Sequence, residues 1–554
     1  MQRYMLFFFV LLILFPGYVT AQQRIAKTVS PTTPILRFEK AEWDITLHTP
    51  FRNPYDQKEL QLDMVLTAPS GKPWVLPCYF DQGDTATSQW KARFAARETG
   101  TYHYYFRLTT AGRSEETTPQ TFTAQPGKKP GFLHTNDHWT FRFDNGELFR
   151  GIGENVGWES RNFENDKWTY DYLLPTLSKN GANYFRTWMC PWNLPLETQK
   201  VNSTKRYVNS TEYFHPGGIQ RMEQLLHLID SLGLYMMLTL DMNSGNWNNS
   251  SYNQANGGPV KTYTEFFSQP AAMEKYKNKL RYVVARWGYS THIGAWEFFN
   301  EIDNGVFTRS DSILIPHVYV THWHREMSRY LKDIDPYQHL VTTSISHRDI
   351  DGLNSIPYID FNQKHIYKHT GKIPAIYPAY IETYGKPYVV GEFGFRWEDQ
   401  DPKYAREANY DYKRGLWFGL FSATPILPMS WWWELFDDQK MTPYFRGVRA
   451  ISDKMLQAGK GRFEQLPISA EVLHVQAVQC GNTAFAYLLN ESDGVATTAV
   501  KFPLTAKSYT VQSYDPNTLQ YKTLTGGKLA NGQFTSPTIT LPAKQELLLL
   551  VTVQ

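Results

Sequence analysis

Short apolar segments alternate with amphipathic helical patterns between residues 149 and 463, and this alternation constrains the fold more than any other feature. Strands covered by helices on both faces have such near-continuous apolar runs. The expected strands are 149–153, 184–188, 235–240, 295–299, 340–344, 361–366, 388–391 and 426–431. Their βαβα order predicts an α/β fold, a (β/α)8 TIM barrel, over residues 127–463.

The helical patterns between these strands are clearest in three places. Apolar residues recur on one helical face over 219–232, 273–287 and 320–331, and the last pattern stops before Asp335-Pro336. Ahead of the first strand, Asn145-Gly146 predicts a tight hairpin that would close the floor of the barrel.

The segments on either side of the barrel have strand patterns without convincing helices. Residues 28–126 alternate with period two between turn signals, which predicts a β-sandwich that resembles an immunoglobulin-like module. Residues 466–554 predict a second, smaller β-sandwich. It could bind carbohydrate or only cover the barrel, and covering is favoured because a fold alone does not imply binding.

The first residues have the pattern of a secretory signal peptide. Arg3 precedes an apolar core, and Ala21 ends a small-residue cleavage pattern, so residues 1–21 are expected to be removed. The apolar run is too short for a membrane span. These features predict a secreted or periplasmic protein.

Charge and cysteine content narrow the classes of partner. The net charge is +3 with scattered basic residues, which excludes a nucleic-acid footprint and favours a neutral partner such as carbohydrate. Cys78, Cys190 and Cys480 are odd in number and lie far apart, so no disulfide is expected. Nothing in the sequence indicates an oligomeric state.

Two glutamates follow predicted strands. Glu301 comes after Asn300 at the end of strand 295–299, and Glu392 follows strand 388–391 between Gly391 and Gly394, glycines that would let the backbone approach a ligand. The carboxyl ends of barrel strands meet at one face, where active sites of this fold lie. Two carboxyl groups in one pocket, one protonated and one ionised, are the requirement of glycoside cleavage.

These residues resemble the signatures of clan A glycoside hydrolases, closest to family 5, the cellulase- and mannanase-like enzymes. The resemblance implies that Glu301 is the general acid/base, that Glu392 is the nucleophile, and that Asn300 binds the 2-hydroxyl of the substrate. It further implies a retaining β-glycoside hydrolase that needs no metal or organic cofactor.

Further residues are candidates for the same site. Arg186 is a charge inside a predicted strand, and by the same resemblance it braces the nucleophile and keeps its pKa low. Tyr367 resembles the tyrosine that donates to the nucleophile. His365 lies two residues earlier on the same rim, and a purely structural role is as plausible for it.

Tryptophans near the strand ends are candidates for stacking on sugar rings. With period two, Trp431 and Trp433 share one face of the last strand, and Trp433, nearer the strand end, is expected to form the floor of the cleavage site. Trp158 and Trp188 are further candidates, for which a role in the core is equally plausible.

Other chemistries have no clear signal in the sequence. There is no phosphate-binding loop, dinucleotide fingerprint or His-Glu-x-x-His motif, and no metal ligands are expected. Two alternatives stay open: a non-catalytic carbohydrate-binding protein on a barrel scaffold, and a transglycosylase that uses the same residues. The sugar, the linkage, the ring form and endo or exo action do not follow from the motifs.

Overall fold

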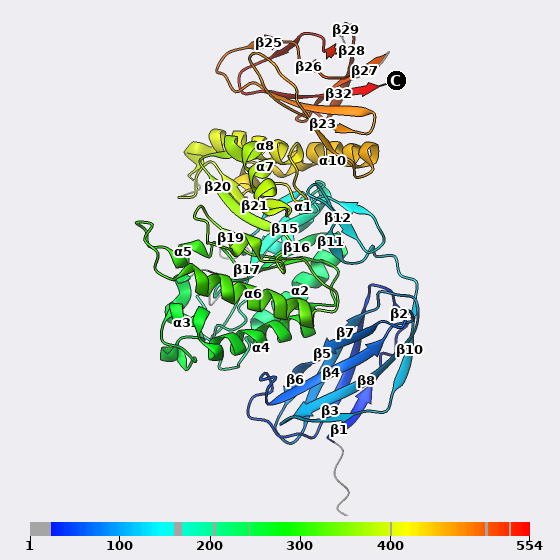
Figure 1. Cartoon of the computed structure of the whole chain (residues 1–554), viewed down its shortest axis with the longest axis vertical. Coiled ribbons are helices and arrows are strands. Elements are labelled where there is room, and N and C mark those ends of the chain that lie inside the picture. The colour runs from blue at the N-terminus through cyan, green and yellow to red at the C-terminus, as the bar shows by residue number, and fades with distance from the viewer. Residues whose placement is uncertain are drawn as a thin grey trace, which may run out of the picture.

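The computed structural model describes residues 24–159, 169–202, 206–242, 244–398, 401–504, 508–530 and 533–553. The expected signal peptide lies outside these ranges, and its cleavage stays a prediction. Within them, a central barrel lies between an N-terminal pair of sheets and a C-terminal group of sheets (Figure 1).

Parallel strands whose side chains are mostly buried line the barrel, and each pairs with the next along the chain except β18 with β19. They are β14 (Gly153–Asn155), β15 (Tyr184–Trp188), β16 (Tyr235–Asp241), β17 (Ile293–Phe299), β18 (Val341–Thr342), β19 (Ser344–Ile345), β20 (Asn362–Tyr367) and β21 (Tyr388–Gly394). The last expected strand forms only isolated parallel bridges. Through them Ser430 pairs with both Glu154 and Phe393, which closes the barrel.

Two strand predictions were wrong in detail. The first barrel strand begins at Gly153, because Phe149 belongs to the hairpin before it. The fifth is interrupted at Thr343, since β18 pairs only with β17 and β19 only with β20.

Helices cover the outside of the barrel. Three of them, α2, α4 and α6 in the list that follows, contain the segments 219–232, 273–287 and 320–331 that were predicted to be helical. The helices are α1 (Thr169–Lys179), α2 (Pro216–Leu232), α3 (Tyr263–Ser268), α4 (Pro270–Trp287), α5 (Asp303–Val306), α6 (His317–Ile334), α7 (Ile373–Tyr384), α8 (Ala405–Leu420), α9 (Trp433–Asp438) and α10 (Phe445–Gly459). Among the described residues, no helix is both long and apolar enough to cross a membrane.

A small antiparallel sheet closes the amino-terminal end of the barrel, as the Asn-Gly pattern predicted. It consists of β11 (Leu133–Thr135), β12 (Phe141–Phe143) and β13 (Leu148–Phe149). Gly146 turns the chain at a φ of +91°, which glycine adopts without strain. The rings of Phe143 and Phe149 each lie 5.2 Å from that of Tyr235, at the start of β16.

The N-terminal residues form two sheets, ordered β1-β3-β7-β6 and β2-β10-β8-β4-β5, with β9 paired to β8. Side chains of both sheets enter one hydrophobic core, including Trp43 of the first sheet and Leu62, Met64 and Tyr104 of the second. The strands are β1 (Ile25–Val29), β2 (Ile35–Leu36), β3 (Lys40–Leu47), β4 (Leu60–Thr67), β5 (Pro73–Pro77), β6 (Tyr79–Gly83), β7 (Ser88–Ala95), β8 (Gly100–Thr110), β9 (Arg113–Glu116) and β10 (Gln120–Gln125).

These sheets pack against the barrel through buried polar contacts. Arg281 of α4 donates to Asp63 of β4 over 2.6 Å, and the Tyr337 hydroxyl accepts from the Ala95 amide over 2.9 Å. Because both partners of each contact are buried, separating the sheets from the barrel would leave polar groups unpaired.

The C-terminal residues form a six-stranded antiparallel sheet that lies over α8 and α10 (Figure 1). Tyr487 stacks on Trp417 of α8 at 5.7 Å, so one face of the sheet covers barrel helices. Two smaller sheets pack on the other face. The strands are β22 (Glu464–Leu466), β23 (His474–Cys480), β24 (Thr483–Leu489), β25 (Ala496–Thr498), β26 (Lys501–Phe502), β27 (Tyr509–Asp515), β28 (Gln520–Leu524), β29 (Lys528–Ala530), β30 (Gln533–Thr535), β31 (Ile539–Leu541) and β32 (Glu546–Val553).

Candidate active site

Glu301 lies two residues beyond the end of β17, at the carboxyl-terminal face of the barrel. Its backbone adopts a φ of +48°, a conformation that costs an L-residue about 1–2 kcal/mol. The Ser344 hydroxyl accepts from the Glu301 amide over 2.9 Å and holds this turn. Backbone strain at a single acidic residue, held by a neighbouring strand, is typical of functional sites.

Glu392 lies within β21 and its carboxylate is bound by two strong donors. Nη1 of Arg186 donates to Oε1 over 2.6 Å, and the Tyr367 hydroxyl donates to Oε2 over 2.6 Å. Only 3% of Glu392 is exposed. Charge-assisted contacts of this length favour the ionised carboxylate.

The guanidinium group of Arg186 forms hydrogen bonds with several polar residues of the site. Besides Glu392, its guanidinium donates to both oxygens of Glu297 over 2.6 and 2.9 Å, and to Oδ1 of Asn300 over 2.7 Å. Since Oδ1 of Asn300 faces Arg186, the amide nitrogen of Asn300 is the group left to donate to a ligand.

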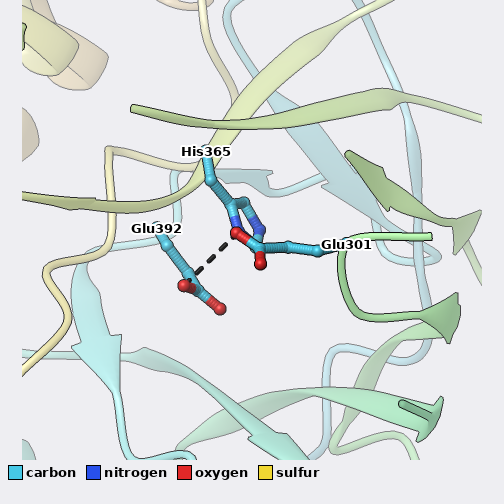
Figure 2. Close-up of side chains that lie close together, drawn as sticks. All are labelled: Glu301, His365 and Glu392. Atoms are coloured by element: carbon cyan, nitrogen blue, oxygen red, sulfur yellow. Dashed lines mark hydrogen bonds and ion pairs between the residues drawn. The ribbon is translucent and has the colours of Figure 1, made fainter. Parts of the chain in front are cut away.

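His365 lies between the two candidate acids, which come from different strands and converge with it in Figure 2. Its Nδ1 is 2.9 Å from Oε1 of Glu301 and 3.3 Å from Oε2 of Glu392. Burial lowers the pKa of His365 to about 4, so the ring is neutral at pH 7 and its single N–H is best placed at Nδ1.

The same three residues each offer one possible metal-ligand atom, and those atoms lie within 4.8 Å of one another. The sequence predicted all three residues in one site, although no metal ligands were expected there. Arg186 and Tyr367 already occupy both oxygens of Glu392. A guanidinium so close would repel a metal ion, and the cluster is better suited to sharing protons.

The pKa values of the two acids are both raised by burial. Burial, with the nearby charge of Asp303, raises the pKa of Glu301 to about 7. Burial also raises the pKa of Glu392, although His365 and Arg186 oppose the change. The expectation that Arg186 keeps the pKa of Glu392 low was therefore wrong in its net direction, because desolvation outweighs the ion pair.

Further polar contacts hold the Glu301 side chain in place. Nδ2 of Asn304 donates to Oε2 of Glu301 over 2.7 Å, and Arg348 donates to Oδ1 of the same amide. Arg348 and Ser346 in turn donate to Asp303, which is fully buried. The side chain of Glu301 is therefore held by a different set of residues from the side chain of Glu392, which is held by Arg186.

The candidate tryptophans gather in one cluster beside Arg186. The Trp158 ring lies 5.3 Å from Trp188, 5.5 Å from Trp431 and 5.1 Å from Trp433. The Arg186 guanidinium lies 5.6 Å from the Trp188 ring and joins the cluster to the acids. Trp158 is half-buried, whereas the other three rings are buried.

The strand-face argument for Trp433 was wrong. Trp432 adopts a φ of +58°, which ends the extended chain, and Trp433 is the first residue of α9. Trp433 is only 1% exposed and packs edge-on against Trp431 at 5.0 Å. Period two does not hold across this turn, so its contact with substrate stays a prediction.

Sequence reasoning missed two buried polar residues of the site, Glu297 and Asn155. Oδ1 of Asn155 accepts from Arg186 over 3.1 Å, while its Nδ2 donates to the carbonyls of Gly391, Met429 and Ser430. A charge inside the apolar run Trp296–Phe299 was the available signal for Glu297, as it had been for Arg186. Nothing in the sequence distinguishes Asn155 from other polar residues.

Gly391 has a different role from the one expected. A Cβ at this position would lie 2.3 Å from Oε1 of Gln363, whose Nε2 donates to Glu297 over 2.8 Å. The glycine therefore makes room for a side chain that supports Glu297, and not for a ligand.

The long loop after β16 lines a cavity of about 80 Å³, which Phe299, the last residue of β17, also lines. Trp247, Ser250 and Tyr252 from this loop line it, together with Asp241 at the end of β16. Lys279 of α4 donates to Asp241 over 2.7 Å and forms an ion pair with Glu197. The loop follows the carboxyl-terminal end of β16, and so it lies on the same face of the barrel as Glu301, which follows β17.

Comparisons with known proteins identify several similar chains. Residues 35–109 match the model of a domain of unknown function (DUF5060). The chain is 23% identical to mannan endo-1,4-beta-mannosidase A of Podospora anserina over 304 residues, which cover 49% of this chain and 70% of that protein. It is 25% identical to mannan endo-1,4-beta-mannosidase A of Aspergillus aculeatus, with 48% and 70% covered.

A crystal structure resembles the whole described architecture. It is that of a Bacteroides vulgatus protein with a provisional assignment as a glycoside hydrolase, with a TM-score of 0.65 at 14% identity, and 94% of this chain and 99% of that chain covered. This likeness supports the fold alone. The similarity to the two mannosidases shows that the chain is a glycosyl hydrolase.

Proposed function

We propose that this protein is an exported retaining β-glycoside hydrolase that cleaves a polysaccharide or oligosaccharide, with mannan as the first substrate to test. The observation that carries the proposal is the separation of the two acids: an oxygen of Glu301 lies within 4.8 Å of an oxygen of Glu392. Retaining enzymes place their carboxyl groups about 5–5.5 Å apart, and inverting enzymes about 6.5–9.5 Å apart.

The contacts of each acid support distinct roles. Glu392, held by Arg186 and Tyr367, is the group better stabilised as an anion and would attack the anomeric carbon. Glu301, with a pKa raised to about 7, would protonate the leaving oxygen. It would then take a proton from the water that hydrolyses the glycosyl-enzyme.

Mannan is proposed because the two named relatives are mannan endo-1,4-beta-mannosidases. Export rests on the signal pattern of residues 1–21. We further propose the domain division inferred above, with sandwich modules at 28–126 and 466–554 around a catalytic barrel at 127–463. The shared cores of the flanking sheets support it.

The test of the proposal is the configuration of the first product. Wild-type protein would be incubated with a panel of β-linked polysaccharides and aryl glycosides, and the anomer released first would be identified by NMR before mutarotation. Retention of the β configuration is expected. Release of the α anomer would contradict the retaining assignment, and products joined to an added sugar acceptor would instead favour transglycosylation.

A prediction concerns the pH dependence of wild-type activity. Since Glu301 must be protonated and its pKa is raised to about 7, kcat/KM should fall as the pH rises through that value. Glu301→Gln has no carboxyl group to ionise at this position, so its residual kcat/KM should show no such fall. An aryl glycoside whose leaving group needs no proton makes this residual activity measurable. If the variant shows the same fall at the same pH, the basic limb belongs to another group.

A second prediction tests the support of Glu301. Asp303→Asn removes a negative charge that helps to raise the pKa of Glu301, and it also frees Arg348 to act on that carboxylate. Both effects favour the ionised form, so the basic limb of kcat/KM should move to lower pH. The pH profile of the variant on the same substrate measures this shift, and a move to higher pH would contradict it.

A further inference from the structure

Trp397 is the one tryptophan of the described residues with a largely exposed side chain, at 61%. It lies in the segment that follows β21, five residues after Glu392. The other described tryptophans are buried or half-buried. A large apolar ring left in water on a loop beside an active site is a feature of ligand-binding surfaces.

Backbone contacts place Trp397 on the rim next to the catalytic pair. The Lys368 amide donates to the carbonyl of Gly394, the last residue of β21, over 3.1 Å. Lys368 directly follows Tyr367, the donor to Glu392, and its ammonium lies 5.8 Å from the centre of the Trp397 ring. The two segments that leave β20 and β21 therefore meet at Trp397.

The residues on either side of Trp397 are held by further contacts. Nε1 of Trp432 donates to the carbonyl of Arg396 over 2.7 Å, and Lys368 pairs with Glu398. The first contact holds the backbone before the exposed ring, and the second ties the side chain of the residue after it to Lys368. A ring held in advance loses less conformational entropy when a ligand binds.

We propose that Trp397 is a stacking platform for a sugar unit of the glycan that lies beyond the unit being cleaved. This inference rests on the proposed function. An uncharged pyranose has an apolar face of C–H groups that fits the indole ring, and hydroxyls around its edge that Lys368 and Glu398 can bind as donor and acceptor. The platform would favour long glycan chains over short ones.

The experiment compares a long substrate with a short one. For Trp397→Ala, the ratio of kcat/KM on a β-1,4-mannohexaose to kcat/KM on an aryl β-mannoside should fall about tenfold, as the loss of one stacking contact implies. Trp397→Phe should restore most of the ratio, because it keeps an aromatic face. Calorimetric binding of the hexaose to Glu392→Ala, with and without Trp397→Ala, should show the same loss in affinity.

The matched control is Tyr521→Ala, which removes an exposed aromatic ring from β28 of the C-terminal sheet. It should leave the ratio unchanged. If the hexaose is cleaved and bound but Trp397→Ala changes neither the ratio nor the affinity, the platform is overturned while the proposed function stands. If wild-type protein neither cleaves nor binds any glycan of the panel, both proposals fail.

Discussion

Glu392→Ala should abolish hydrolysis, with a fall in kcat of at least about 10⁴-fold on every substrate that wild type cleaves. Loss of a nucleophile removes the covalent route, and residual binding contacts cannot replace it. Arg186 keeps its contacts with Glu297 and Asn300 in this variant, so the barrel should stay folded. The measurement is steady-state hydrolysis of an activated aryl glycoside, with folding checked by circular dichroism.

Azide provides the decisive second readout for this variant. Alanine leaves space beside the anomeric carbon, and a small anion that enters it should attack from the face that Glu392 used. The product would be a glycosyl azide of inverted configuration, identified by NMR. Glu382→Ala, on the exposed face of α7, is the matched control and should retain wild-type rates without azide. Wild-type turnover by Glu392→Ala would exclude Glu392 as the nucleophile.

The barrel was predictable because its strands are buried on both faces. Their apolar runs stand out between helical patterns, and the segments at Tyr184 and Tyr388 were located to within a few residues. The acids could be found for a related reason, since a carboxylate at the end of an apolar strand has few structural explanations. Strand ends at hairpins and turns were less predictable, as Phe149 shows.

The errors at the site have a common physical cause. Trp433 was placed by a strand period that ends at Trp432, where the backbone turns left-handed. Glu297 and Asn155 act on Arg186 across the barrel from different strands, and a sequence shows neither the distance nor the direction of such contacts. The direction of the pKa shift of Glu392 also depends on how deeply its carboxyl group is buried, and this burial follows from three-dimensional packing.

Glu297→Gln should reduce both stability and catalysis although Glu297 has no proposed contact with substrate. The carboxylate is completely buried and accepts from Arg186 twice, from Thr239 over 2.7 Å and from Gln363 over 2.8 Å. An amide in its place must turn an NH2 group toward one of these donors. Breaking one side of a buried ion pair costs about 3–5 kcal/mol, and the free energy of unfolding should fall by about that amount.

The effect on catalysis follows from the position of Arg186, which also holds Glu392 and Asn300. A displacement of about 1 Å in such a group can cost about 10²-fold in rate, so kcat should fall by about that factor with a smaller change in KM. Removal of one negative charge from the shared guanidinium also stabilises the Glu392 anion. The acidic limb of kcat/KM should therefore move to lower pH.

Asp63→Asn is the matched control, because it breaks the buried pair with Arg281 between the N-terminal sheets and the barrel. It should lower stability by a similar amount, yet leave the acidic limb of the pH profile in place. Denaturant unfolding followed by tryptophan fluorescence, together with pH profiles of both variants, separates the two cases. If Glu297→Gln loses stability but keeps the wild-type kcat and pH profile, Glu297 supports only the fold and does not position Arg186 for catalysis.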